Sequence, residues 1–219
     1  MPSLIDIRTG RIATHAGHRT AYAKSSRAGP VAVHPLGLEG DAVADTRVHG
    51  GPWKAVYAYA VINYALWAAD HPQHGERLVP GAFGENLLVD GLDESTVCIG
   101  DHMRIGSAIL SPCQPRQPCA TMARWFGDPH MVKAMVRNGR AGWYLAVIQP
   151  GTIRIGDTIT LEQRHEDAFS IADVLAASYT ASPSAETLRA LAGQPGLAPG
   201  WAAWARQQAE SGKPAPKPL

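Results

Sequence analysis

Short strand-like segments separated by glycine turns fill the chain up to about residue 163, and then this pattern stops. Residues 5–8 alternate between apolar and polar side chains, residues 31–34 are a second candidate strand, and residues 142–148 form an apolar run typical of a buried strand. Beyond Arg164 alanine dominates, and we predict three helices: 171–178 with Ser170 as cap, 184–192 after Ser182-Pro183, and 201–211 after Pro199-Gly200. We therefore predict a mainly β fold with helices (α+β), divided into a β domain at 1–163, a small three-helix unit at 164–212 and a mobile tail at 213–219.

A Gly-Asp pair interrupts alternating β-branched residues twice, at Gly100-Asp101 and at Gly156-Asp157. This pattern is typical of a turn or bulge at the corner of a β-barrel, rather than of a long-period repeat. Asp101 could assist proton delivery at a site, but its Gly-Asp context favours a turn.

Composition limits the classes of function. Apolar residues make up 45% of the 219 residues, which is enough for a substantial core, and a formal net charge of +1 argues against nucleic acid as a main partner. Three cysteines do not suggest a disulfide framework, the N-terminus does not resemble a signal peptide, and no apolar run is long enough to span a membrane. We expect a cytoplasmic protein with reduced thiols and no membrane partner, either a monomer or a homodimer.

The segment from Ser111 to Cys119 holds three prolines, two cysteines and Arg116, and it follows the apolar run at 105–110. Because proline lacks an N–H donor, we predict a stiff loop that ends this strand. Arg116 suits a phosphate or carboxylate, and Cys119 precedes a predicted helix whose amides would favour its thiolate. The alternative is a turn with two buried cysteines; a zinc site with Cys98 is disfavoured by the irregular spacing.

Three glycine loops lie at strand ends, at 37–41, 49–54 and 81–86. Glycine lets backbone amides approach a ligand closely, and Lys54 could hold an anion. Neither the phosphate loop nor the dinucleotide fingerprint is present. Each loop alone could be an ordinary turn, but together with His49, Lys54 and Glu85 they predict a shared rim. His49 would be a cofactor contact or a structural hydrogen bonder, since no second histidine stands at ligand spacing.

Six motifs in order carry a resemblance to a known family. They are Gly-Leu-Glu-Gly-Asp (37–41), His-Gly-Gly with a following lysine (49–54), Phe-Gly-Glu-Asn-Leu (83–87), Ile-Gly-Asp (99–101), Pro-Arg-x-Pro-Cys (115–119) and Gly-Trp-Tyr (142–144). The chain resembles the MOSC domain of molybdenum-cofactor sulfurases, and in particular the short stand-alone bacterial branch with a C-terminal three-helix extension.

The resemblance implies a MOSC-type β-barrel that carries a molybdenum cofactor (Mo-molybdopterin) in a cleft. Cys119 would be the catalytic residue and the protein ligand to molybdenum. The residues that would hold the pterin and its phosphate are His49, Gly50, Gly51, Lys54, Phe83, Gly84, Glu85, Asn86 and Arg116. The implied activity is that of an oxidoreductase: reduction of N-hydroxylated compounds, such as N-hydroxylaminopurine bases, to an amine and water, as in detoxification.

Electrons would come from a separate donor reductase, because the chain has neither a flavin fingerprint nor an iron–sulfur cysteine set. Two alternatives use the same residues. One is a non-catalytic carrier of the cofactor or of a persulfide, and the other is a cofactor-free cysteine enzyme, which would need a base near Cys119.

Overall fold

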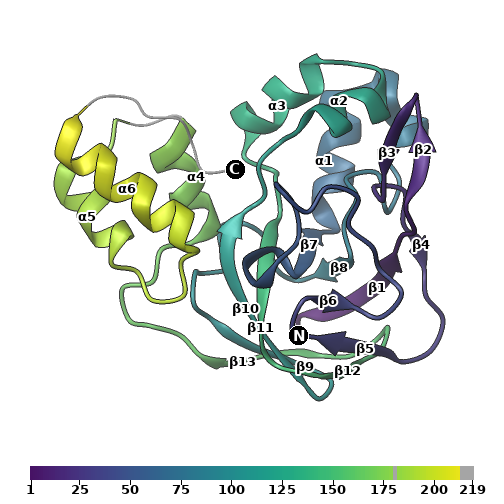
Figure 1. Cartoon of the computed structure of the whole chain (residues 1–219), viewed down its shortest axis with the longest axis horizontal. Coiled ribbons are helices and arrows are strands. Elements are labelled where there is room, and N and C mark those ends of the chain that lie inside the picture. The colour runs from purple at the N-terminus through teal and green to yellow at the C-terminus, as the bar shows by residue number, and fades with distance from the viewer. Residues whose placement is uncertain (180–181, 213–219) are drawn as a thin grey trace.

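The computed structural model describes residues 1–179 and 182–212, which form a curved sheet with helices on two sides (Figure 1). The predicted tail at 213–219 lies outside the described residues. The strands are β1 (Ser3–Thr9), β2 (Ala13–His15), β3 (His18–Thr20), β4 (Ser25–Ser26), β5 (Val31–His34), β6 (Gly37–Leu38), β7 (Val56–Ala60), β8 (Leu87–Asp90), β9 (His102–Ile105), β10 (Ala108–Pro115), β11 (Trp143–Gln149), β12 (Gly151–Ile153) and β13 (Ile159–Gln163). The helices are α1 (Ile62–Asp70), α2 (Ala120–Phe126), α3 (His130–Asn138), α4 (Ile171–Tyr179), α5 (Ala185–Ala192) and α6 (Pro199–Ser211), with short 3-10 turns η1 (Pro52–Lys54) and η2 (Pro72–Arg77).

Eight strands form the main sheet in the order β13-β9-β10-β11-β7-β8-β1-β4. The sheet bends round until its two sides meet, since Leu4 N donates to Asp157 O (2.9 Å) and Ile159 N donates to Pro2 O (2.9 Å). Most neighbours are antiparallel, but β7 and β8 are parallel and are joined through α1. All five residues of β7 are buried, as expected for a strand covered on both faces. The predicted mainly β fold with helices (α+β) is confirmed.

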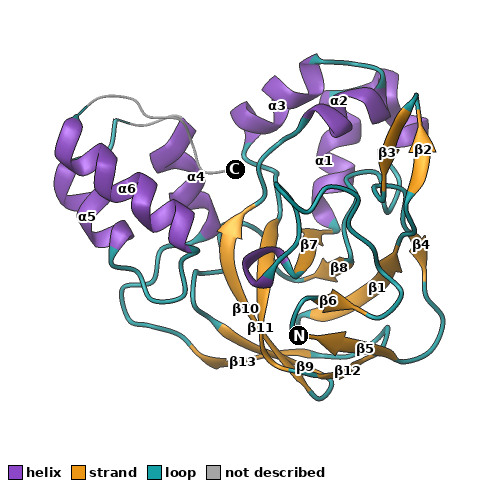
Figure 2. Cartoon of the chain, viewed as in Figure 1, coloured by secondary structure: helices purple, strands orange, loops and turns teal. Residues whose placement is uncertain are grey.

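Helices gather in two groups, one above the strands and one beside them at the left of the view (Figure 2). One group contains α1, α2 and α3, and the other contains α4, α5 and α6. Both groups share one hydrophobic core with the strands, which includes Leu4, Phe83, Leu110, Leu175 and Trp201. The predicted helices at 171–178, 184–192 and 201–211 correspond to α4, α5 and α6. The boundary between the two predicted domains stays a prediction. None of the helices in the described part of the chain is long and apolar enough to cross a membrane.

The apolar run at 105–110 is a hairpin corner and not one strand. Gly106, at φ +55°, turns the chain between β9 and β10, which pair antiparallel. The Gly-Asp turns are found as expected, with Gly100 at φ +82° and Gly156 at φ +91°. Asp101 is fully buried and forms an ion pair with Arg164 (2.6 Å), so it supports the turn.

The prediction that the prolines after Leu110 end the strand is wrong. β10 continues to Pro115 and pairs with β11 through both Pro112 and Pro115, with a register shift at Cys113. The strand tolerates these prolines because β9 pairs only with Ala108 to Leu110. Beyond Leu110, β10 is an edge strand on one side, where a missing N–H leaves no neighbouring acceptor unsatisfied. The rigid segment therefore delivers Arg116 and Cys119 from a strand end.

Candidate cofactor site

A cavity of about 420 Å³ lies where the end of β10 meets the loops around residues 18–24, 41–50 and 83–86. Its walls come from segments that are far apart in the sequence, and most of their charged side chains are basic. The charged and histidine side chains in its lining are His18, Arg19, Lys24, Asp41, Asp45, His49, Lys54, Arg116 and Arg124.

Cys119 lines this cavity at the first residue before α2. Its backbone is extended (φ −132°, ψ 165°), so the thiol stands at the start of the helix, and its Sγ lies 3.8 Å from Arg116 Nη2. Burial raises the pKa of the Cys119 thiol, but the Arg116 charge and the amides of Met122 and Thr121 outweigh it and bring the pKa below the ordinary value. The structure thus favours a thiolate here, which is the form that binds soft metals.

Arg116 is 3% exposed, and no carboxylate among the described residues forms an ion pair with it. Its Nη1 instead lies 3.0 Å from Met135 Sδ and 3.3 Å from Met122 Sδ, and its guanidinium lies 5.7 Å from the centre of the Tyr57 ring. A buried guanidinium without a carboxylate is costly, and buried charges are normally paired. This charge is therefore available to an anionic ligand.

Lys54 and His49 add to the positive wall. Lys54 Nζ donates to Val48 O (2.7 Å) and lies 6.0 Å from the Tyr144 ring centre. Burial lowers the pKa of Lys54. Burial, with smaller effects of Lys54 and Arg116, lowers the pKa of His49, so His49 is neutral at neutral pH and can serve as a hydrogen-bond donor or acceptor.

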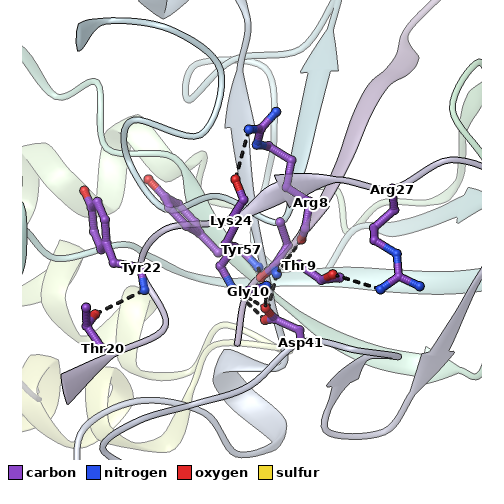
Figure 3. A network of polar contacts seen from close by, with 10 residues as sticks. Arg8, Thr9, Gly10, Thr20, Tyr22, Lys24, Arg27, Asp41 and Tyr57 are labelled. Atoms are coloured by element: carbon purple, nitrogen blue, oxygen red, sulfur yellow. Dashed lines mark hydrogen bonds and ion pairs between the residues drawn. The ribbon is translucent and has the colours of Figure 1, made fainter. Parts of the chain in front are cut away.

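A network of polar contacts around Asp41 also contributes to the cavity wall (Figure 3). Lys24 Nζ lies 2.6 Å from both carboxylate oxygens of Asp41, and Gly10 N donates to the same carboxylate (2.7 Å). Asn86 Nδ2 donates to Asp41 Oδ2 (2.8 Å), and its Oδ1 accepts from Tyr57 N (3.1 Å). Because the charges of Lys24 and Asp41 compensate each other, this network fixes the loops and leaves the net positive charge to the Arg116 side.

Tyr22 presents a buried hydroxyl to the cavity. Among the described residues its Oη has no hydrogen-bond partner, and burial raises the pKa of the phenol despite the opposing charge of Arg116, so the group is a neutral donor. The ring fits against the backbone at Gly84, where an added Cβ would stand 3.0 Å from it. A buried hydroxyl without a partner calls for an explanation, and a bound ligand oxygen would satisfy it.

The structure brings most of the predicted site residues together. Those that line the cavity are His49, Gly50, Lys54, Phe83, Gly84, Asn86, Arg116 and Cys119. Glu85 and Gly51 are not part of the lining. Glu85 is fully buried, and its Oε1 accepts from Tyr64 Oη (2.6 Å) and Gly81 N (2.5 Å), so it braces the loop from behind. Gly51 is exposed and precedes η1.

Sequence reasoning missed Tyr22, Lys24, Tyr57, Thr121 and Arg124, all of which line the cavity. Lys24 and Tyr22 stand in a polar stretch without a motif, and only the fold brings them to the site. Tyr57 had a usable signal, because it belongs to the run Val-Tyr-Ala-Tyr before α1, in which a phenol hydroxyl must find a partner when buried.

These residues fit a molybdenum–pterin cofactor. The buried guanidinium and Lys54 suit a phosphate, and the free Tyr22 hydroxyl suits a polar ring atom. The described residues contain no group of three or more His, Cys, Asp or Glu that could hold a metal ion. A metal at Cys119 would therefore need most of its ligands from the cofactor itself, which agrees with a single protein thiolate.

A family model for the MOSC domain matches residues 45–160. The chain belongs to the MOSC domain family. The matched part includes η1, β10 and α2, and with them the site residues His49, Lys54, Arg116 and Cys119. The MOSC match ends before α4, so the C-terminal helices lie outside it.

Relatives and solved structures extend the likeness to nearly the whole chain. Protein YiiM of Escherichia coli is 34% identical over 210 residues, which cover 95% of this MOSC chain and 93% of YiiM. A protein of Gibberella moniliformis named "Reductase" is 37% identical over 175 residues, but the match covers only 31% of that longer protein. The crystal structure of YiiM from E. coli has a TM-score of 0.83 at 30% identity and covers 97% of this chain and 94% of that one.

Proposed function

We propose that the protein is a molybdenum-cofactor-dependent reductase that converts N-hydroxylated compounds, for example N-hydroxylated purine bases, to amines. The observation that carries the proposal is Cys119 Sγ at 3.8 Å from the buried Arg116, on the wall of a cationic cavity. Membership of the MOSC family and the relative named "Reductase" support it. The three free thiols support a reducing compartment, for which we propose the cytoplasm.

Each side chain in the cavity has a role in the proposal. Cys119 would hold the metal, Arg116 and Lys54 would hold the pterin phosphate, and Tyr22 would donate to a polar atom of the pterin. When bound, the cofactor supplies two-electron chemistry that protein side chains cannot. The protein contributes binding, orientation and a largely buried positive wall. Arg116 lowers the pKa of the Cys119 thiol and so favours the thiolate, and neutral His49 can exchange a proton at the cavity wall.

The overall reaction consumes two electrons and two protons for each N–OH group, and yields an amine and water. All three cysteines are free, and Cys113 is fully buried, so the thiols do not form an internal electron store. The proposal therefore includes a separate electron-donor protein as partner.

Turnover and metal content together test the proposal. We expect the protein, purified with its cofactor, to reduce N-hydroxylaminopurine with an artificial electron donor, and Cys119→Ala to lose both molybdenum and activity. Cys98→Ala is the control, because Cys98 is also a free cysteine but is buried and does not line the cavity, and it should keep both. Full retention of molybdenum and activity in Cys119→Ala would overturn the proposal. Bound molybdenum without turnover would favour a carrier.

A further inference from the structure

A second cavity, of about 250 Å³, lies between the loop at 46–54 and the beginning of α6. Val48, His49, Gly50 and Lys54 line both this cavity and the one that holds Cys119. The two cavities therefore share a wall made by a single loop, and a molecule in the second would lie beside the first.

Hydrogen bonds hold the two sides of the second cavity in place. Trp201 Nε1 on α6 donates to Gln114 Oε1 (2.9 Å), and Gln114 Nε2 donates to Trp53 O (2.6 Å). A backbone hydrogen bond links the same two segments, since Ala198 N donates to Cys113 O (2.9 Å). β10 thus supports the second cavity at residues 113–114 and the first at Arg116, which fixes their relative position.

The walls of the second cavity combine apolar side chains, two of them indoles, with the polar side chains of Thr46, Arg47 and Gln114. Pro52, Trp53, Pro199 and Trp201 contribute to them, and Lys54 and His49 stand on the side toward the first cavity. Trp53 is 37% exposed, which leaves part of its indole open to a ligand. Aromatic side chains favour stacked or edge contacts with flat rings.

We propose that the second cavity binds the planar heteroaromatic ring of the substrate, with Trp53 as a principal ring contact, so that the N–OH group reaches toward Cys119. This inference rests on the proposed function. One wall of the cavity, residues 46–54, lies within the part that matches the MOSC domain, and the other, at the start of α6, lies outside it. It is therefore a specificity-determining site for ring-bearing substrates.

Binding of adenine, a planar base that cannot be reduced at an N–OH group, tests the site without turnover. We would label the tryptophans with 5-fluorotryptophan and assign the Trp53 fluorine resonance from its loss in Trp53→Phe. Adenine should shift the Trp53 resonance, and Trp53→Ala should weaken binding about tenfold while Trp53→Phe largely restores it. Leu36→Ala, another exposed apolar side chain in a loop, should leave the affinity unchanged. No shift at Trp53, or equal affinity in Trp53→Ala, would overturn the inference.

Kinetics separate this inference from the proposed function. In Trp53→Ala, KM for N-hydroxylaminopurine should rise about tenfold, while kcat, molybdenum content and KM for a small aliphatic hydroxylamine stay unchanged. An equal effect on both substrates would overturn the ring site and leave the reductase proposal intact. Trp53-dependent adenine binding in a protein that reduces no N-hydroxylated compound would support the ring site and overturn the reductase proposal.

Discussion

Arg116 lines the candidate site and also affects the stability of the folded protein. It is buried, contacts sulfur atoms and an aromatic ring, and among the described residues has no carboxylate partner. Cys119 Sγ, 3.8 Å away, is a counter-charge when the thiol is ionised, but a buried guanidinium without a carboxylate still destabilises a protein that holds no anionic ligand. Functional sites often carry such a cost in stability, and this one is consistent with a site arranged to bind a ligand.

Replacing Arg116 tests this trade-off. We expect Arg116→Met to raise the free energy of unfolding of the cofactor-free protein by roughly 1–3 kcal/mol, since a similar volume is kept and the buried charge is removed. The same variant should lose molybdenum and should alkylate Cys119 several-fold more slowly at neutral pH, because the pKa of the thiol rises without the neighbouring cation.

Urea denaturation, metal analysis and iodoacetamide kinetics measure these three effects. The kinetics belong in a Cys98→Ala, Cys113→Ala background, so that Cys119 alone reacts. A variant that is less stable and still holds molybdenum would contradict this view of Arg116.

Glu85 is a buried carboxylate whose pKa is raised by burial, against the opposing hydrogen bonds from Tyr64 and Gly81. Because the pKa is higher in the folded protein than the ordinary 4.5, the unfolded chain ionises first as pH rises. The free energy of unfolding should therefore fall as pH rises from about 4.5 through the raised pKa.

Glu85→Gln should remove this part of the pH dependence and raise the stability at neutral pH, because the amide oxygen keeps both hydrogen bonds and carries no charge. Glu94, whose pKa burial also raises, would keep its own share of the slope. The free energy of unfolding is measured by thermal unfolding from about pH 4 to 8. Carboxylates with raised pKa values titrate in roughly this range. We also expect normal molybdenum content, since Glu85 does not line the cavity; a loss of molybdenum in a stable Glu85→Gln protein would instead support its predicted cofactor contact.

Among the elements, β10 does the most to position the site, because it joins the sheet to both cavities. Gln114 is the side chain that connects it to α6 and η1. Gln114→Ala would leave the buried Trp201 Nε1 without an acceptor, and should lower the free energy of unfolding by about 1–3 kcal/mol.

Chemical denaturation of Gln114→Ala and Gln149→Ala provides the comparison. Gln149 is exposed and also donates to a backbone oxygen, that of Ser107 (3.1 Å), so its replacement should cost no more than about 0.5 kcal/mol. Equal, small losses in the two variants would show that the contact between β10 and α6 contributes little.

The sequence was informative where local chemistry decides the structure. Helices α4, α5 and α6 and the turns at Gly100 and Gly156 follow from caps, glycine and side-chain periodicity. It was misleading at Pro112, because a proline excludes a strand only where a neighbouring strand needs its N–H, and strand order is not a local property. Tyr22 and Lys24 are brought to the site by the tertiary fold, and no sequence motif indicates this.

At the scale of the whole molecule, the C-terminal helices and the sheet share one core. Ile99 N donates to Phe169 O (2.9 Å) and Ile171 N donates to Val97 O (2.9 Å), so the two parts also exchange backbone hydrogen bonds. Trp201 is 1% exposed and packs in the common core.

A fragment of residues 1–163 should therefore not fold as the full chain does. We expect it to lack a cooperative thermal transition and to bind a hydrophobic dye, because its apolar surface toward α4 and α6 is uncovered. Calorimetry of the fragment beside the full chain gives the answer, and a sharp transition in the fragment would support two separate domains at the predicted boundary.

The central claim is that the Cys119 thiolate is a ligand to molybdenum, and X-ray absorption at the molybdenum edge tests it most directly. The spectrum of the loaded protein should show one sulfur ligand more than that of loaded Cys119→Ser, in which an oxygen takes its place, while Cys98→Ser should match the unchanged protein. Identical sulfur coordination in the unchanged protein and in Cys119→Ser would contradict the claim.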